Sequence, residues 1–196
     1  MKKVILYGGA FDPPTIAHTK VLEACISCAD TIGAEVWLLP SGTRRDKSII
    51  TPRADRLEFA EALVQSVNGE GRVKIYSYEL DRPGLTQTHV THGHLEESYP
   101  DTEFIWVFGS DSIVSMRSIW VEGERLWNEL NMLVVPRPGY ILGELPPKAE
   151  LMDVETPIVS STQVREYMAQ GKDYSMLVPR EVYTTLQKNV TKKEIG

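Results

Sequence analysis

The chain has 196 residues, of which 42% are hydrophobic, and a formal net charge of −6 at pH 7. This length favours one α/β domain around a single core over two unrelated domains. The acidic balance, with a pI near 5.3, argues against a nucleic-acid-binding protein, because a duplex-binding surface needs a basic footprint. No apolar run approaches the roughly 18 residues of a membrane span and no signal-peptide core follows Met1, so we expect a cytoplasmic protein with no membrane partner.

Short apolar runs bounded by polar or turn residues predict buried parallel strands. They cover residues 4–7, 36–39, 73–76, 104–108, 132–135 and 157–159. Helical patterns cover residues 15–29, 53–67, 89–98, 112–116, 125–130, 162–171 and 179–188. This alternation predicts an α/β fold with a Rossmann-like, doubly wound, mostly parallel sheet and C-terminal helices. We expect one domain over residues 1–196, with a Rossmann-like core at 1–160 and a helical part at 161–196.

The segment after the first predicted strand has the pattern of a phosphate site. Residues 8–18 read Gly-Gly-Ala-Phe-Asp-Pro-Pro-Thr-Ile-Ala-His, and Thr15 and His18 share one face at the start of a helix. Unpaired N–H groups at a helix start carry partial positive charge and attract anions. The alternative is a tight strand-to-helix turn in which Thr15 is an ordinary cap and His18 a partly buried surface residue.

A second helix start lies near the C-terminus. Residues 160–166 read Ser-Ser-Thr-Gln-Val-Arg-Glu, where Ser160 and Gln163 fit a capping box and Gly171 can end the helix. Three consecutive hydroxyl groups followed by Arg165 also predict a second helix-start phosphate site. The capping and phosphate-binding interpretations are compatible.

These two segments resemble the signatures of the nucleotidyltransferase superfamily. Residues 15–18 look like its (H/T)-x-G-H motif, and residues 159–165 look like its I-S-S-T-x-x-R motif. Further segments occur in the order seen in bacterial nicotinate-mononucleotide adenylyltransferases: residues 51–53, 79–84, 109–111, 120 and 135–140. The resemblance covers about residues 3–187. It implies transfer of AMP from ATP to nicotinate mononucleotide or nicotinamide mononucleotide in NAD biosynthesis, giving deamido-NAD or NAD plus pyrophosphate.

The resemblance also implies roles for individual residues. The implied catalytic residues are His18, Thr15 and Arg165; the implied ATP and phosphate contacts are Gly8, Gly9, Phe11, Lys47, Ser160, Ser161 and Thr162. The implied pyridine-mononucleotide contacts are Thr88, Gly109, Asp111, Trp120 and Arg137. Mg²⁺ is implied as the companion of ATP, with no separate metal site in the protein. The expected partners are these small substrates, and a homo-oligomer stays open.

Three of these residues have simpler interpretations. Trp120 fits a half-buried interior aromatic residue, Asp111 fits the N-cap of a helix at 112–116, and Arg137 fits a surface salt bridge. The alternative functions are another nucleotidyltransferase, such as a phosphopantetheine adenylyltransferase or a cytidylyltransferase, and a non-catalytic sensor of adenine nucleotides.

Apart from Thr15, which the family accepts in place of the first motif histidine, the chain departs from the family pattern at two places. Ala17 stands where the first motif has glycine, and residues 86–91 resemble S-Y-T-x-D-T with Gln87 and Val90 in place of the aromatic residue and the acid. We expect activity to be retained despite the first departure, with an inactive relative as the alternative, and the second departure leaves the preferred acceptor open.

Two other groups of residues could suggest a metal or redox site. Cys25 and Cys28 lie on a predicted helix with no second cysteine pair, so we interpret them as structural thiols. We interpret His89, His92 and His94 as a polar helix face, because His94 does not share a face with the other two.

Overall fold

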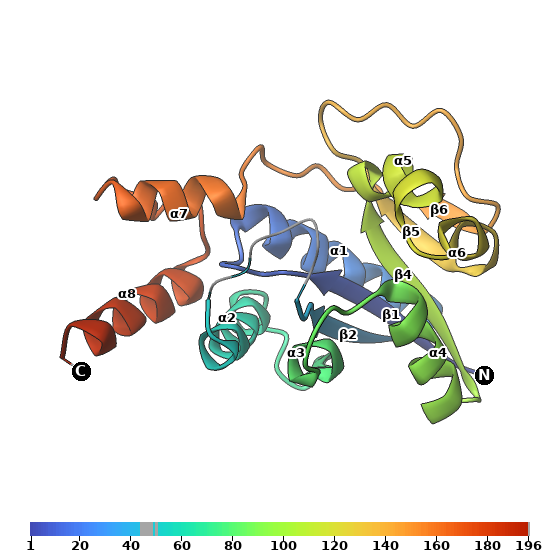
Figure 1. The fold of residues 1–196 in the computed structure, drawn as a ribbon, viewed down its shortest axis with the longest axis horizontal. Helices are drawn as coiled ribbons and strands as arrows, with labels where there is room; N and C mark the ends of the chain where they lie inside the picture. Colours follow the sequence, from blue (N-terminus) through green and yellow to red (C-terminus); the bar gives the residue numbers. More distant parts are fainter. Residues whose placement is uncertain (44–48, 50, 196) are drawn as a thin grey trace.

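The computed structural model describes residues 1–43, 49 and 51–195, with side chains to residue 190. Six strands form one sheet in the order β3-β2-β1-β4-β5-β6 (Figure 1). They are β1 (Lys2–Gly9), β2 (Glu35–Pro40), β3 (Val73–Ile75), β4 (Thr102–Gly109), β5 (Asn131–Val135) and β6 (Ala149–Leu151). Every neighbouring pair is parallel, which confirms the predicted doubly wound sheet. The chain order reverses between β1 and β4, where such sheets bind ligands.

The predicted strand at residues 157–159 is wrong. The sixth strand is β6, which pairs with residues 132–134 of β5 and has one half-buried and two exposed residues. Pro157 has no N–H for a strand ladder, and Ile158 is 87% exposed. The apolar run at residues 157–159 therefore forms an exposed turn. The actual edge strand, β6, has too few apolar residues to be predicted from the sequence.

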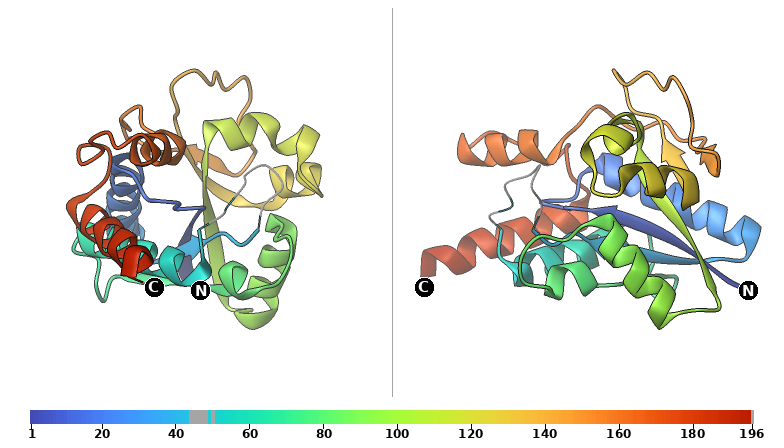
Figure 2. Two further views of the ribbon diagram at one scale, coloured as in Figure 1. Left: turned by 60° about the vertical axis from the view of Figure 1, so that its left-hand side comes forward. Right: turned by 45° about the vertical axis from the view of Figure 1, so that its right-hand side comes forward.

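The helices cover both faces of the sheet (Figure 2). They are α1 (Ile16–Ile32), α2 (Arg53–Ser66), α3 (Tyr78–Asp81), α4 (Thr88–Ser98), α5 (Ser110–Ile119), α6 (Gly123–Glu129), α7 (Ser161–Ala169) and α8 (Arg180–Ile195). In the left view of Figure 2, α1 and α2 lie on one side of the sheet and α4, α5 and α6 on the other. The short α3 has no counterpart among the predicted helices.

β1 shows how the two faces are filled. Ile5 and Tyr7 pack in the cluster that contains α1 and α2, whereas Val4 and Leu6 pack in the cluster that contains α4, α5 and α6. Successive side chains of a strand point to opposite faces, so a central strand buried on both faces is apolar throughout. Cys25 packs in the first of these clusters, and burial raises the pKa of its thiol, which fits a structural role.

The C-terminal helices pack on α2 through their described side chains. Phe59 of α2 is buried with Val164 of α7 and Val182 of α8. The backbone N–H of Ile16, the first residue of α1, donates to the carbonyl of Leu177 at 3.1 Å. This packing brings the start of α7 close to the start of α1, about 145 residues earlier in the sequence.

The histidines of α4 contact three different neighbours. His89 lies 3.9 Å from Glu122, His92 accepts from Trp106 Nε1, and His94 stacks on Tyr78. Within the described part of the chain no three metal-ligating side chains converge.

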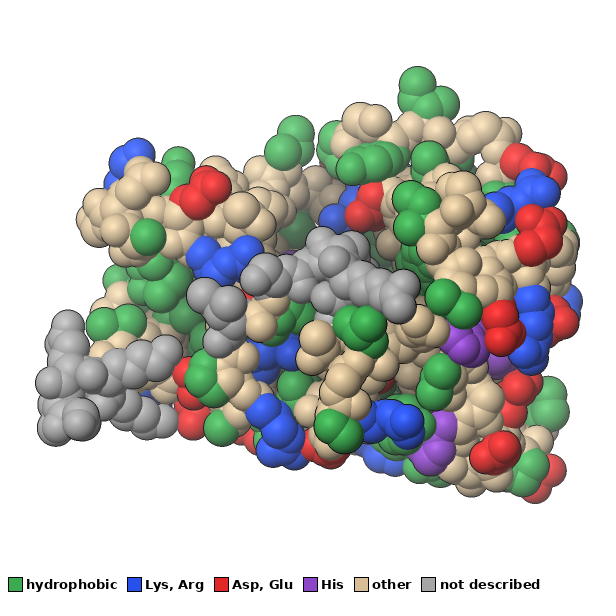
Figure 3. Space-filling view, viewed as in Figure 1, with side chains coloured by type: hydrophobic (Ala, Val, Ile, Leu, Met, Phe, Trp, Pro, Cys, Tyr) green, Lys and Arg blue, Asp and Glu red, His purple; other side chains and the backbone are tan. Residues whose placement is uncertain are grey.

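Charged side chains of both signs are mixed on the surface over α5 and α6 (Figure 3). Arg117 pairs with Glu124, and Arg125 pairs with both Glu122 and Glu129, in all cases with exposed side chains. Exposed pairs of this kind contribute little stability each. No described helix is long and apolar enough to cross a bilayer.

Candidate active site

A cavity of about 420 Å³ opens at the carboxyl edge of the sheet, where β1 and β4 end side by side. Gly8 and Gly9 line it from β1, Phe108 and Gly109 from β4, and Val135 from β5. Its position at the reversal of strand order is the one that general rules for open α/β sheets predict. The predicted site residues that line it are Gly8, Gly9, Phe11, His18, Thr88, Gly109, Asp111, Trp120, Arg137 and Ser161.

The loop after β1 is built around the ring of Phe11. Phe11 has a φ of 47° and is almost fully buried, with its ring edge-on to Tyr7 and His18 at 5.4 Å each. A Cβ on Gly9 would lie 2.8 Å from the Phe11 ring, so only glycine leaves room for this arrangement. Phe11 thus supports the loop and the His18 ring, while the glycine lets the backbone pass close to the cavity.

Thr15 positions His18. The Thr15 backbone N–H donates to His18 Nδ1 at 3.0 Å, and Thr15 Oγ1 lies 2.8 Å from the same nitrogen. A backbone N–H can only donate, so Nδ1 accepts and the neutral imidazole carries its proton on Nε2. Thr15 itself is fully buried and does not line the cavity. The pair therefore presents a defined imidazole N–H donor, with Thr15 acting through His18.

The start of α7 holds the loop after β1. Ser161 Oγ donates to the Pro13 carbonyl at 2.8 Å, and Arg165 Nη1 donates to the Asp12 carbonyl at 2.5 Å. Arg165 Nη2 also donates to Thr162 Oγ1 at 3.3 Å.

The hydroxyl of Ser160 accepts from the Gln163 N–H at 3.1 Å, so the predicted N-cap of α7 is confirmed. Of the four predicted residues in this segment, only Ser161 lines the cavity. Ser160, Thr162 and Arg165 hold the frame around it.

An ion pair lies on the opposite wall. Arg137 Nε is 3.2 Å from Asp111 Oδ1, and the Arg137 backbone N–H donates to Ser110 Oγ at 2.9 Å. A Cβ on Gly109 would collide with both Asp111 and Arg137, so this pair requires glycine there. Asp111 is not the N-cap of α5, because that helix begins at Ser110 with Gly109 as its N-cap. The salt bridge expected of Arg137 exists, but it faces the cavity.

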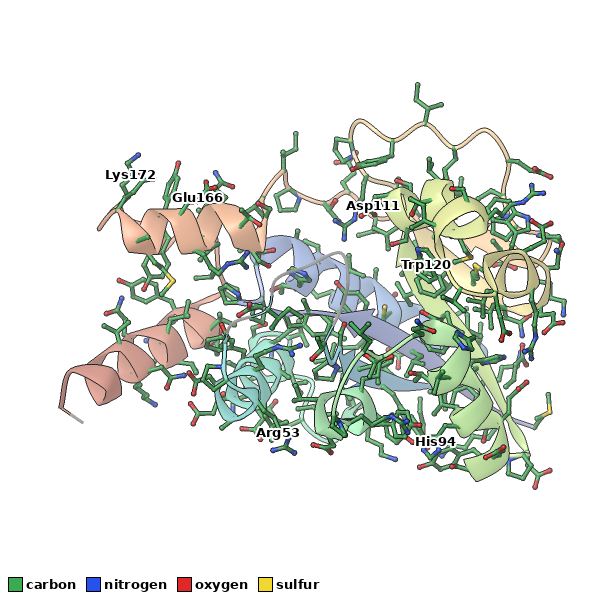
Figure 4. All side chains as sticks on the ribbon, in the orientation of Figure 1. Arg53, His94, Asp111, Trp120, Glu166 and Lys172 are labelled. Atoms are coloured by element: carbon green, nitrogen blue, oxygen red, sulfur yellow. The ribbon has the colours of Figure 1, made fainter. Side chains whose placement is uncertain are left out.

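Three aromatic rings also line this wall. Trp106 and Phe108 are stacked at 5.7 Å, and Phe108 meets Trp120 edge to face at 5.4 Å. Trp120 follows α5 while Asp111 lies in its first turn (Figure 4). Trp120 is half-buried and also lines the cavity. Its ring can therefore pack against Phe108 and still be accessible to a ligand.

The two departures from the family motifs differ in their position relative to the cavity. Ala17 and Val90 do not line the cavity, whereas Gln87 does. Lys47 falls outside the described residues. The Ala17 methyl therefore leaves the described cavity wall unchanged, and Gln87 is the substitution that alters it.

Several residues around this cavity have no assigned role in the sequence-based predictions. Glu79 of α3 lines it, and Arg56 and Asp12 are buried polar residues beside it. One sequence signal could have revealed Arg56: it lies on the face of α2 that also carries Phe59 and Leu63, where an apolar residue is expected.

Comparison with known proteins identifies the class. The model of the cytidylyltransferase-like family matches residues 6–167, and the chain belongs to this family.

Curated relatives place it more narrowly, among the nicotinate-nucleotide adenylyltransferases. A relative from Halalkalibacterium halodurans, named probable nicotinate-nucleotide adenylyltransferase, is 34% identical over 93% of this chain and 87% of its own length. A relative of the same name from Exiguobacterium sibiricum is 33% identical over 92% of this chain and 93% of its own. The resemblance drawn from the motifs is confirmed.

Solved structures show the same fold. The nicotinic acid mononucleotide adenylyltransferase of Plasmodium falciparum complexed with NaAD superposes with a TM-score of 0.83 at 23% identity, covering 96% of both chains. The structure of that protein complexed with APC gives a TM-score of 0.79 at 21% identity, again over 96% of both chains.

Proposed function

We propose that the protein transfers AMP from ATP to the 5′-phosphate of nicotinate mononucleotide, giving deamido-NAD and pyrophosphate. The observation that carries the proposal is that the His18 side and the Trp120–Arg137 side line the same cavity. A site for two anionic substrates of this kind needs phosphate donors on one wall and a surface for a ring on the other. The names of the curated relatives support the same reaction.

The reaction needs no protein nucleophile. An oxygen of the acceptor phosphate attacks the α-phosphorus of ATP, and the bond to the leaving pyrophosphate breaks as the new P–O bond forms. The work left to the protein is to align two polyanions and to stabilise charge on the transferred and leaving phosphates. His18 supplies an N–H donor oriented by Thr15, and Ser161 and Arg165 keep the loop 8–15 in place.

The other wall would receive the mononucleotide. Arg137 supplies positive charge for its phosphate, Asp111 accepts from ribose hydroxyls, and the exposed side of the Trp120 ring stacks on the pyridine. Thr88, at the first turn of α4, and Gln87 lie on the part of the wall that would surround the pyridine substituent.

We propose that Mg²⁺ enters as the complex with ATP. The described residues include no cluster of three or more His, Cys, Asp or Glu side chains able to form a metal cage. Phosphate oxygens are ligands that Mg²⁺ favours, and the bound ion neutralises part of their charge. The protein would therefore bind the Mg²⁺–ATP complex as its substrate, with the ion held by the phosphates.

The test is release of pyrophosphate from ATP and Mg²⁺ with nicotinate mononucleotide or nicotinamide mononucleotide as acceptor. We expect release with nicotinate mononucleotide and a lower kcat/KM with the amide. Release with neither acceptor, together with ATP binding in calorimetry, would replace the proposal with a non-catalytic nucleotide sensor. Preference for phosphopantetheine or a cytidine nucleotide would assign another branch of the family.

A further inference from the structure

Arg56 is an unusual feature of the region beside the cavity. Its side chain comes from α2 and the residue is only 3% exposed. Burial lowers the pKa of the guanidinium, while the nearby charges of Asp12 and Glu79 raise it. Burying a cation is costly unless it is hydrogen-bonded and compensated by opposite charge. Arg56 is compensated in both ways, which calls for an explanation beyond filling space.

The hydrogen bonds of Arg56 join two loops at the carboxyl edge of the sheet. Nε and Nη2 donate to the Ala10 carbonyl at 3.2 and 2.8 Å, and Nη2 also donates to the Ser41 carbonyl. Ala10 follows β1 and Ser41 follows β2, and the Ser41 N–H donates to the Gly9 carbonyl at 2.8 Å. One guanidinium thus ties together the loops that leave two adjacent strands.

This contact orients the loop that carries the first phosphate motif. In a planar trans peptide the C=O and the following N–H point in opposite directions. Holding the Ala10 carbonyl toward Arg56 therefore turns the N–H of Phe11 away from Arg56. The Asp12 carbonyl is held in turn by Arg165, and the Pro13 carbonyl by Ser161. Three carbonyls of one loop are thus fixed from two helices.

The second nearby carboxylate, Glu79, is bound to two threonine hydroxyls. Glu79 Oε1 accepts from Thr91 Oγ1 at 2.7 Å, and Glu79 Oε2 accepts from Thr86 Oγ1 at 3.3 Å. Glu79 thereby holds the segment that leads through Gln87 to Thr88 on the proposed pyridine side. Asp12 and Glu79 are both negative beside a cavity for two polyanions, so the charge of Arg56 also offsets a repulsive field.

We infer that Arg56 is a positioning residue for both substrates. It orients the phosphate loop through Ala10, it ties that loop to the one after β2 through Ser41, and it places a buried positive charge in the neighbourhood of Asp12 and Glu79. It touches neither reacting phosphate, and the inference rests on the proposed adenylyl transfer.

The experiment compares Arg56→Met and Arg56→Lys with Arg72→Met, an exposed arginine whose partner is Asp30. For Arg56→Met we expect kcat to fall about 100-fold and the KM of both substrates to rise, because loop misplacement of about 1 Å has effects of this size. Arg56→Lys keeps the charge but not the fork, so we expect near-normal KM values and a kcat about tenfold low. Arg72→Met should match the wild type.

A second substitution separates charge from geometry. In the Arg56→Met background, Glu79→Gln removes a carboxylate that has lost its compensating cation, so the KM of the mononucleotide should fall back while kcat stays low. Near-wild-type kinetics of Arg56→Met would overturn the inference. Loss of folding in both Arg56 variants, measured by near-UV circular dichroism, would do the same by assigning Arg56 to the fold alone.

Failure of the proposed function leaves a distinguishable result. A wild type without turnover would contradict adenylyl transfer, whereas calorimetric ATP affinity still reports on the loop after β1. We expect Arg56→Met to bind ATP about tenfold more weakly than Arg72→Met. Equal affinities would contradict the role of Arg56 on that side of the cavity.

Discussion

The two walls of the cavity are built in different ways. On the β1 side, side chains from α2 and α7 hold backbone carbonyls, as Arg56 holds Ala10 and Arg165 holds Asp12. On the β4 side, side chains meet each other, in the ion pair of Arg137 with Asp111 and in the ring contact of Phe108 with Trp120. A backbone scaffold suits phosphates, which every nucleotide shares, whereas a wall of side chains can be changed by single substitutions to suit a particular ring.

The strongest test of this comparison is His18→Ala. We expect kcat to fall about 10²- to 10³-fold, the usual effect of losing one preorganised donor to a transition-state oxygen. Thr15→Val, which keeps the backbone N–H that orients Nδ1, should cost much less. The measurement is steady-state pyrophosphate release, with circular dichroism as the folding control. Full turnover in a folded His18→Ala variant would remove this side chain from the mechanism.

Arg165→Met tests the frame on the β1 side. We expect a loss in kcat of about 100-fold, because the Asp12 carbonyl loses its charged donor and the site loses a cation. Lys172→Met, at an exposed residue beyond α7, is the matched control and should leave kinetics unchanged. A selective rise in the mononucleotide KM, with kcat and the ATP KM unchanged, would contradict the assignment of Arg165 to the β1 side of the cavity.

Trp120→Ala tests the β4 side. The KM of the mononucleotide should rise about tenfold with little change in the ATP KM, as expected for loss of one stacking contact. Trp120→Phe should recover most of that loss. Equal effects of Trp120→Ala on both substrates would mean that the ring only supports Phe108.

The smallest expected effect is a pH dependence of stability on the β4 side. Burial lowers the pKa of His92, with Arg125 adding to the decrease while Glu96 and Glu129 oppose it. The unfolded chain therefore binds the proton first as the pH falls below about 6.5, and native stability decreases from pH 7 toward pH 5. Protonation also removes Nδ1 as acceptor for Trp106 Nε1.

His92→Asn keeps an acceptor near Nδ1 without a titrating group. Its thermal midpoint should change less between pH 7 and pH 5 than that of the wild type. An identical change in both proteins would show that protonation of His92 is not linked to unfolding.

Most strands and helices can be predicted from the sequence because the patterns that indicate them lie within short segments. Buried runs such as residues 4–7 predict strands without further information, and the capping pattern of Ser160 and Gln163 predicts the start of α7. β6 could not be predicted from the sequence, because an edge strand with mostly exposed side chains has no apolar run. It is defined only by its pairing with β5. The contacts of Thr15 with His18 and of Arg165 with the Asp12 carbonyl were not predicted either, since a motif does not reveal which of its side chains turn toward neighbours.

The fold class and the two helix starts follow from continuous apolar runs and capping residues, and the family follows from the resemblance of two motifs; all of these are properties of short segments. The link that Arg56 makes between Ala10 and Ser41, and the meeting of Asp111 with Arg137 across the end of the sheet, come from the tertiary structure alone. These facts depend on side chains from distant segments meeting at distances near 3 Å, and packing of the whole chain sets such distances.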